Sequence, residues 1–155
     1  MSLLGFCQWL EQTSLSVAIR ESSWGFPIIE SVHTLGLCLF GMAILMDLRV
    51  LRLALTRVPA REIAVDLAPW MTAGLVIMMV SGILVFLNTP VEYYNNIVFR
   101  IKVILLLLVA VNAAVTARLL RGRKTALACS VSLALWAAII LASRMITYSL
   151  LGPSE

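Results

Sequence analysis

The sequence predicts an all-α membrane protein, an antiparallel four-transmembrane-helix bundle preceded by a short N-terminal interfacial helix. Its 155 residues have a mean hydropathy of +1.00, and 61% of them are hydrophobic, whereas soluble domains are about 45–50% apolar. Only 13% are charged, which is about half the usual share. A soluble domain of this length has too little interior to bury so much apolar surface. The lipid bilayer is therefore the expected partner.

The N-terminal segment, residues 1–26, is expected to form an amphipathic interfacial helix and a linker. Apolar residues recur there at helical spacing, and the polar residues Glu11 and Gln12 interrupt the run. A helix with this pattern lies in the plane of the membrane surface, and a soluble N-terminal cap is the alternative. No positively charged stretch precedes the apolar run, so a cleavable signal peptide is not expected.

Residues 27–155 are expected to form one transmembrane domain of four helices. A hydrocarbon core about 30 Å thick needs about 20 mostly apolar residues in a helix. Helices satisfy their own backbone groups where water is absent. The stretches that are long enough are residues 27–48, 64–87, 96–119 and 125–151.

Helix-breaking residues mark the ends of these stretches. Pro27 suits the first turn of a helix, where a missing N–H costs nothing. Asn88, Thr89 and Pro90 follow the second stretch, and Gly152-Pro153 follows the fourth. The connections between stretches are short, which favours an up-and-down bundle.

The basic residues set the expected orientation. Eight of the twelve Lys and Arg residues lie in the loops that follow the first and third spans: Arg49, Arg52, Arg57, Arg61, Arg118, Arg121, Arg123 and Lys124. Basic loops stay in the cytoplasm, so both termini are expected on the periplasmic side of a bacterial inner membrane. No basic stripe with interleaved aromatic residues is present, and a nucleic-acid partner is not expected.

Four ionisable residues are expected to share one shallow layer near the outer boundary. The outward ends of the first and third spans are residues 27 and 96, and His33 and Lys102 each lie six residues inside those ends. The fourth span ends outward at residue 151, and Arg144 lies seven residues before it. At about 1.5 Å per residue, these positions are about 9–11 Å deep. Glu30 lies one turn nearer the surface.

Each of these residues also has a purely structural interpretation. A histidine can bond a neighbouring helix, and Lys and Arg can extend their stems toward the interface. Charges at helix centres cost about 2.5–3.5 kcal/mol each on insertion scales. Several such costs in one layer favour a compensating partner, which is either another member of the layer or an anionic ligand between the helices.

Haem b is the ligand that this set of residues predicts. The only histidine, His33, is a good axial ligand for haem iron when its ring is neutral. Lys102 is expected either to be the second iron ligand in its deprotonated form or to pair with a haem propionate. Arg144 is expected to pair with a propionate, and Glu30 to balance the charge of the cluster. Methionines are further candidates for the second ligand: Met42, Met71, Met78, Met79 and Met145. A zinc or copper site needs more ligands than His33 and Glu30 supply, unless methionines join them.

Two stretches carry a resemblance to known families. "ESSWGFPIIESVHTLGLCLFGMAILMDLRVLR" (Glu21–Arg52) resembles an uncharacterised bacterial family of four-helix membrane proteins. His33 and "FRIKVILLLLVAVNA" (Phe99–Ala113) are similar to the membrane protoporphyrinogen oxidases and, more loosely, to copper-resistance membrane domains. In the oxidases a helix-one histidine and a helix-three lysine are essential and associated with haem b, which implies such roles for His33 and Lys102. That family has further histidines where this chain has Asn112 and Thr116.

Two functions are therefore weighed. The first is a haem b protein for one-electron transfer or sensing near the outer leaflet, acting on a porphyrin or a lipid-soluble substrate; as an enzyme it would be an oxidoreductase. The second is a cofactor-free scaffold, accessory subunit or small transport protein whose ionic cluster fixes the helices. Neither identifies a redox partner. Small residues at Gly74, Ser81 and Gly82 would permit a homodimer as well as close packing within one chain.

Overall fold

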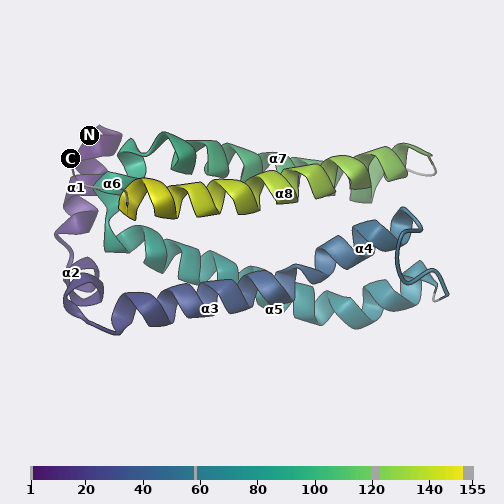
Figure 1. Ribbon diagram of the computed structural model, residues 1–155, viewed down its shortest axis with the longest axis horizontal. Coiled ribbons are helices and arrows are strands. Elements are labelled where there is room, and N and C mark those ends of the chain that lie inside the picture. Colours follow the sequence, from purple (N-terminus) through teal and green to yellow (C-terminus); the bar gives the residue numbers. More distant parts are fainter. Residues whose placement is uncertain (1, 58, 120–122, 152–155) are drawn as a thin grey trace. The chain divides into compact units, whose positions relative to one another are not determined.

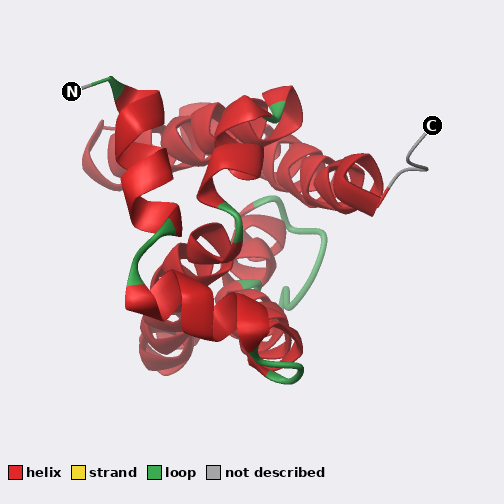
Figure 2. Ribbon diagram, turned by 90° about the vertical axis from the view of Figure 1, so that its left-hand side faces the viewer, coloured by secondary structure: helices red, strands yellow, loops and turns green. Residues whose placement is uncertain are grey.

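The computed structural model describes residues 2–57, 59–119 and 123–151, and every regular element in these ranges is an α-helix (Figure 2). The helices are α1 (Leu3–Glu11), α2 (Ser14–Glu21), α3 (Gly25–Phe40), α4 (Met42–Val50), α5 (Ala60–Asn88), α6 (Pro90–Asn95), α7 (Ile97–Leu119) and α8 (Arg123–Leu151). The all-helical class is confirmed. Arg121 of the second basic loop, and the breaker Gly152-Pro153, lie outside the described residues.

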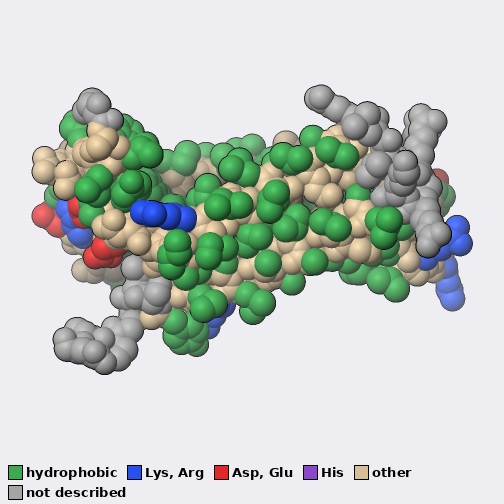
Figure 3. Space-filling view, turned by 90° about the horizontal axis from the view of Figure 1, so that it is seen from above, with side chains coloured by type: hydrophobic (Ala, Val, Ile, Leu, Met, Phe, Trp, Pro, Cys, Tyr) green, Lys and Arg blue, Asp and Glu red, His purple; other side chains and the backbone are tan. Residues whose placement is uncertain are grey.

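Four helical stretches are long and apolar enough to cross a membrane: Gly25–Val50, Glu62–Asn88, Ile97–Thr116 and Thr125–Tyr148. These candidate spans coincide with the four expected stretches, with ends that differ by a few residues. Many of their large apolar side chains are exposed, for example Leu107 (63%) and Leu141 (66%). Figure 3 shows hydrophobic side chains along the helices of the face in view. Apolar exposure on this scale is what lipid would cover.

The first span is not one continuous helix. Gly41 separates α3 from α4, with φ −58° and ψ −14°, and its N–H is shared between the carbonyls of Leu37 and Leu39. The sequence gives little warning of this break, since a single glycine inside an apolar run is tolerated in membrane helices.

Contacts divide the chain into two compact units, each described by itself. The first holds Met1–Ala43 and Arg61–Asn95, and the second holds Ile44–Ala60 and Asn96–Glu155. In the first unit, α3 and α5 lie side by side, and α1, α2 and α6 lie near one end of the pair (Figure 1). In the second, α7 and α8 lie alongside each other in opposite directions (Figure 1).

The N-terminal segment forms two helices where the sequence predicted one. Gln12 ends α1, and the side chain of Thr13 caps α2 by accepting a hydrogen bond from the Ser16 N–H. The fully buried Ser16 hydroxyl in turn donates to the Leu87 carbonyl in the last turn of α5. Contacts of α1 with α6 complete this end of the unit. Helix α6 itself occupies the segment that was expected to be a loop, with Pro90 at its first position.

Helices α3 and α5 cross closely because both carry glycine at the crossing. A Cβ atom at Gly36 would lie 2.8 Å from Cγ2 of Ile77, and one at Gly74 would lie 2.9 Å from the Gly36 carbonyl oxygen. Real Cβ atoms essentially never come this close. Small residues are what allow membrane helices to approach each other in this way.

The second unit packs mainly through α8. The buried side chains of this helix include Cys129, Trp136, Ile139 and Ile146. The Asn112 amide of α7 donates to the Ala128 carbonyl of α8 over 3.0 Å. A polar side chain therefore links α7 to α8 directly.

Candidate functional site

The candidate site begins with His33 on α3, which bonds to α5. Its Nδ1 atom lies 2.9 Å from Oγ of Ser81, whose side chain is buried. The ring also lies against the next residue of α5, since a Cβ at Gly82 would lie 3.3 Å from its Cε1 atom. Gly36 follows His33 by three residues on the same helical face, so the glycine crossing brings the ring to α5.

The hydrogen bonds of Ser81 define the state of the histidine ring. A serine hydroxyl has one proton to donate, and Oγ of Ser81 lies 2.5 Å from the Ile77 carbonyl oxygen, within the same helix. With its proton directed there, Ser81 accepts from His33, and Nδ1 of the ring carries a proton. In a neutral imidazole the lone pair is then on Nε2. The hydrogen bond thereby holds the ring of His33 against α5.

Glu30 lies one turn before His33 and is exposed. It is near the buried Tyr93 of α6, whose pKa is raised above its ordinary value of 10.0, mainly by burial and further by the negative charges of Glu30 and Glu92. The first unit therefore brings Glu30 toward α6, at the end of α3 where the span begins.

Lys102 and Arg144 belong to the second unit. Lys102 is partly buried on α7. Arg144 is exposed on α8, and its guanidinium carbon lies 5.8 Å from the ring centroid of Tyr148, within the range of a cation–π interaction. His33 and Glu30 thus belong to the first unit, and Lys102 and Arg144 belong to the second. The gathering of all four in one layer stays a prediction from the sequence.

A second polar cluster was missed by the sequence analysis. In the second unit, the Asp47 carboxylate of α4 accepts hydrogen bonds from Ser132 and Cys129 of α8. Asp47 stands near the cytoplasmic end of the first expected span, where an acidic residue among arginines is unremarkable in sequence. Only the packing of α4 shows that the acid contacts α8.

The described residues lack the cluster of ligands that a bare metal ion needs. No group of three His, Cys, Asp or Glu side chains gathers within residues 2–57, 59–119 and 123–151, whereas zinc sites use three or four protein ligands. Haem supplies four nitrogens itself and needs one or two axial ligands from the protein. His33, the only histidine of the sequence, is the one imidazole that could supply such a ligand.

An apolar groove lies beside the histidine's partner. It has a volume of about 320 Å³ and is lined by residues of α3 and α5: Ile28, Ile29, Val32, Val76, Ile77, Val80, Ser81 and Leu84. Ser81 is its only polar lining residue. The groove and the hydrogen bond to His33 therefore share one side chain.

These features define an all-helical protein with four candidate membrane spans and one oriented histidine inside a span. A family model matches residues 6–151, and the chain belongs to that family, DUF6644, a family of unknown function. No curated protein and no solved structure matches the chain. Membership agrees with the expected uncharacterised family, while the similarity to protoporphyrinogen oxidases and copper-resistance domains stays an expectation.

Proposed function

We propose that this protein binds haem b through Nε2 of His33 and serves in one-electron transfer or redox sensing near the outer leaflet of a bacterial inner membrane. The single observation that carries the proposal is the hydrogen-bonded chain from His33 through Ser81 to the Ile77 carbonyl. Histidines that bind metals donate their other ring N–H in the same manner, which fixes the ring and raises its basicity.

Each residue has a role that follows from its chemistry. His33 supplies the axial nitrogen, and Ser81 holds the ring against α5. Lys102 supplies either a second ligand or a positive charge for a propionate, and Arg144 supplies another such charge. Glu30 balances charge at the outer end of α3. Bound haem would contribute a reversible change of iron oxidation state, and a porphyrin or a lipid-soluble substrate would exchange the electron.

The spans are proposed to form an antiparallel bundle with both termini on the periplasmic side. The basic residues after α4 and around the α7–α8 connection support this orientation. The N-terminal helices are then interfacial helices at the periplasmic surface. Alkaline phosphatase fused after Glu155 should be active, and the same reporter inserted at Arg57 should be inactive; the reverse pattern would refute the orientation.

An absorption spectrum tests haem binding directly. Protein purified in mild detergent from haem-replete cells should show a Soret band that shifts on reduction, and His33→Ala should lose it. Thr34→Ala is a matched control, because that hydroxyl is exposed and donates only to the Glu30 carbonyl in its own helix. Folded wild-type protein that stays colourless after haem is added would reject the proposal.

Ser81→Ala separates ring orientation from ligation. This variant keeps Nε2 of His33 but loses the acceptor for its Nδ1–H. Since neighbouring hydrogen bonds raise ligand basicity, the variant should keep haem and bind it with a changed reduction potential. An unchanged potential would show that Ser81 does not tune the ligand.

A cofactor-free scaffold or accessory subunit is the second candidate, and one observation favours it. The His33–Ser81 bond joins α3 to α5 next to the glycine crossing, so the bond can serve to hold two helices together. Under this candidate His33→Ala lowers the stability of a colourless protein.

A further inference from the structure

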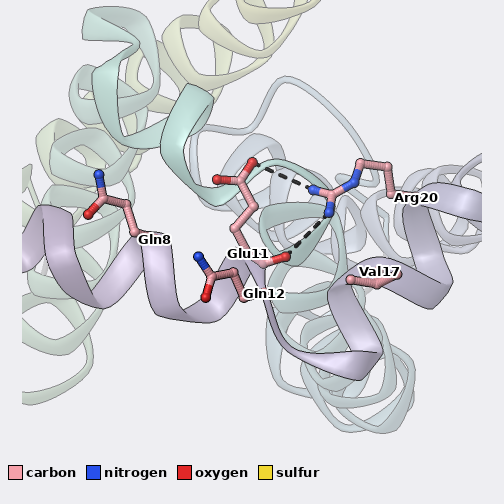
Figure 4. A pocket seen from close by; sticks show the side chains of 5 residues that line it. All are labelled: Gln8, Glu11, Gln12, Val17 and Arg20. Atoms are coloured by element: carbon pink, nitrogen blue, oxygen red, sulfur yellow. Dashed lines mark hydrogen bonds and ion pairs between the residues drawn. The ribbon is translucent and has the colours of Figure 1, made fainter.

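A polar pocket lies between the two N-terminal helices, in the first unit and apart from His33. It has a volume of about 660 Å³ and is lined by Gln8, Glu11, Gln12, Val17 and Arg20. Figure 4 shows Arg20 reaching from α2 toward Glu11 of α1, with Gln8 on the same helix and Gln12 directly after its end. The spacing of 8 and 11 puts Gln8 and Glu11 on one face of α1, and Gln12 follows as the C-cap of that helix.

The two charges in the pocket are loosely paired. Nη1 of Arg20 lies 3.5 Å from Oε1 of Glu11, and Nη2 lies 3.4 Å from the Glu11 carbonyl oxygen. Their side chains are 40% and 31% exposed. A guanidinium has five N–H donors and a carboxylate accepts several hydrogen bonds, so these contacts use only part of the capacity of each group.

The pocket is held at the end of the membrane spans. Ser16 of α2 donates to the Leu87 carbonyl, one residue before the second candidate span ends at Asn88. A Cβ at Gly25, where the first span begins, would lie 3.0 Å from Cβ of Ser22. Helix α2 is thereby fixed to the same end of two spans, which is the depth of lipid headgroups.

Side chains on the other face of α1 suit lipid. Phe6 and Trp9 are exposed (46% and 56%) and their rings stack with centroids 5.9 Å apart. Aromatic residues of this kind are enriched at the membrane–water interface. Helix α1 therefore presents aromatic side chains to the bilayer and polar side chains to the pocket.

We propose that this pocket binds the phosphoethanolamine headgroup of a membrane phospholipid. Arg20 pairs with the phosphate, because a guanidinium matches phosphate geometry with parallel N–H bonds. Glu11 accepts N–H bonds from the primary ammonium, and the amides of Gln8 and Gln12 complete the contacts. One positive and one negative side chain match a headgroup that itself carries one charge of each sign.

The same charges disfavour the other common headgroups. A phosphatidylglycerol has no cation for Glu11, and its phosphate meets the negative charge of that residue. A phosphatidylcholine has a cation without N–H donors, so it makes no hydrogen bond to the carboxylate. The site therefore selects for a primary ammonium and a phosphate held together. This inference depends on the membrane spans and is independent of haem binding.

Native mass spectrometry tests the selection. The full-length protein in detergent is mixed with equal amounts of phosphatidylethanolamine, phosphatidylcholine and phosphatidylglycerol that carry the same acyl chains. We expect phosphatidylethanolamine adducts to exceed each of the others by roughly tenfold, the effect of about one charge-assisted hydrogen bond. Soluble O-phosphoethanolamine should displace the lipid, and inorganic phosphate should not.

Variants assign the two charges. Glu11→Gln should abolish the preference for phosphatidylethanolamine over phosphatidylcholine, and Arg20→Gln should weaken the binding of all three lipids. Glu21 is an exposed acid outside the pocket, so Glu21→Gln should change neither the preference nor the binding strength. Gln8→Ala, which leaves the ion pair intact, should weaken phosphatidylethanolamine binding if either charge variant fails to fold. Equal binding of the three lipids by the wild type, preference for phosphatidylglycerol, or displacement by inorganic phosphate would overturn the proposal.

Discussion

The glycine crossing of α3 and α5 makes Gly74→Ala the sharpest test of the first unit. A Cβ atom at Gly74 would meet the Phe40 backbone nitrogen, and it would lie 2.8 Å from Cβ of Leu39 and 2.9 Å from the Gly36 carbonyl oxygen. None of these atoms is the end of a flexible side chain. The two helices must therefore separate, and the His33–Ser81 hydrogen bond must lengthen with them.

The cost of Gly74→Ala follows from three contributions. Overpacking costs about 1–3 kcal/mol, and a lost interhelical hydrogen bond in a membrane costs about 0.6 kcal/mol on average. Alanine returns up to about 1 kcal/mol through its helix propensity. We expect the free energy of unfolding to fall by about 1–3 kcal/mol, measured by titrating detergent-solubilised protein with dodecyl sulfate and following circular dichroism.

Gly5→Ala is the matched control for this substitution. Its added methyl group would meet only Oγ of Ser2, at 3.3 Å, so the change in unfolding free energy should stay within about 0.5 kcal/mol. Because the proposed haem ligation by His33 depends on the same crossing, Gly74→Ala should also reduce haem retention. A Gly74→Ala protein as stable as the wild type would refute the close crossing and the positioning of His33 that rests on it.

Three further changes test other parts of the structure. Asn112→Ala removes the link to the Ala128 carbonyl and should lower unfolding free energy by about 0.6–1.7 kcal/mol; no loss in the same dodecyl sulfate titration would contradict that link. The raised pKa of Tyr93 means that the folded state holds the hydroxyl proton more tightly than the unfolded state does. The contribution of this proton to the free energy of unfolding is fully present below pH 10.0 and is lost as pH rises through the folded-state pKa. Tyr93→Phe should remove that part of the pH dependence of thermal unfolding. Ser16→Ala loses the bond to Leu87 and should speed proteolysis between α1 and α2 while the spans stay protected, and unchanged cleavage would oppose the anchoring role.

The spans could be predicted from sequence because hydropathy and length alone decide whether a segment crosses lipid. The smaller helices were harder, although two left local signals. Thr13 has the position and side chain of a helix N-cap, and Pro90 suits the first residue of a helix. The break at Gly41 left little signal, because a single glycine inside an apolar run is tolerated in membrane helices.

The contact of His33 with Ser81 agrees with the depth argument that selected the polar layer. His33 lies six residues (33 − 27) after the expected outer end of the first span, and Ser81 lies six residues (87 − 81) before that of the second. Helices that run in opposite directions place these positions at one height. The sequence could supply the height of each residue, but it could not supply the rotation of each helix or its choice of neighbour. Ser81 was therefore read as a packing residue, and its role as the partner of His33 was missed.

The charges of the layer lead to a final prediction about Lys102. Lys102 and Arg144 bring two positive charges to the expected depth and Glu30 brings one negative charge, so one cation is left for a bound anion. A charge at a helix centre costs about 2.5–3.5 kcal/mol, and one at the shallower expected depth of Lys102 costs less, so Lys102→Met should make the haem-free protein moderately more resistant to unfolding. The same variant should retain less haem, because a ligand or a propionate partner is gone. Parallel measurements of thermal unfolding and of the Soret absorbance per protein separate the two effects. A Lys102→Met protein that is less stable and holds as much haem as the wild type would show that the lysine serves packing alone.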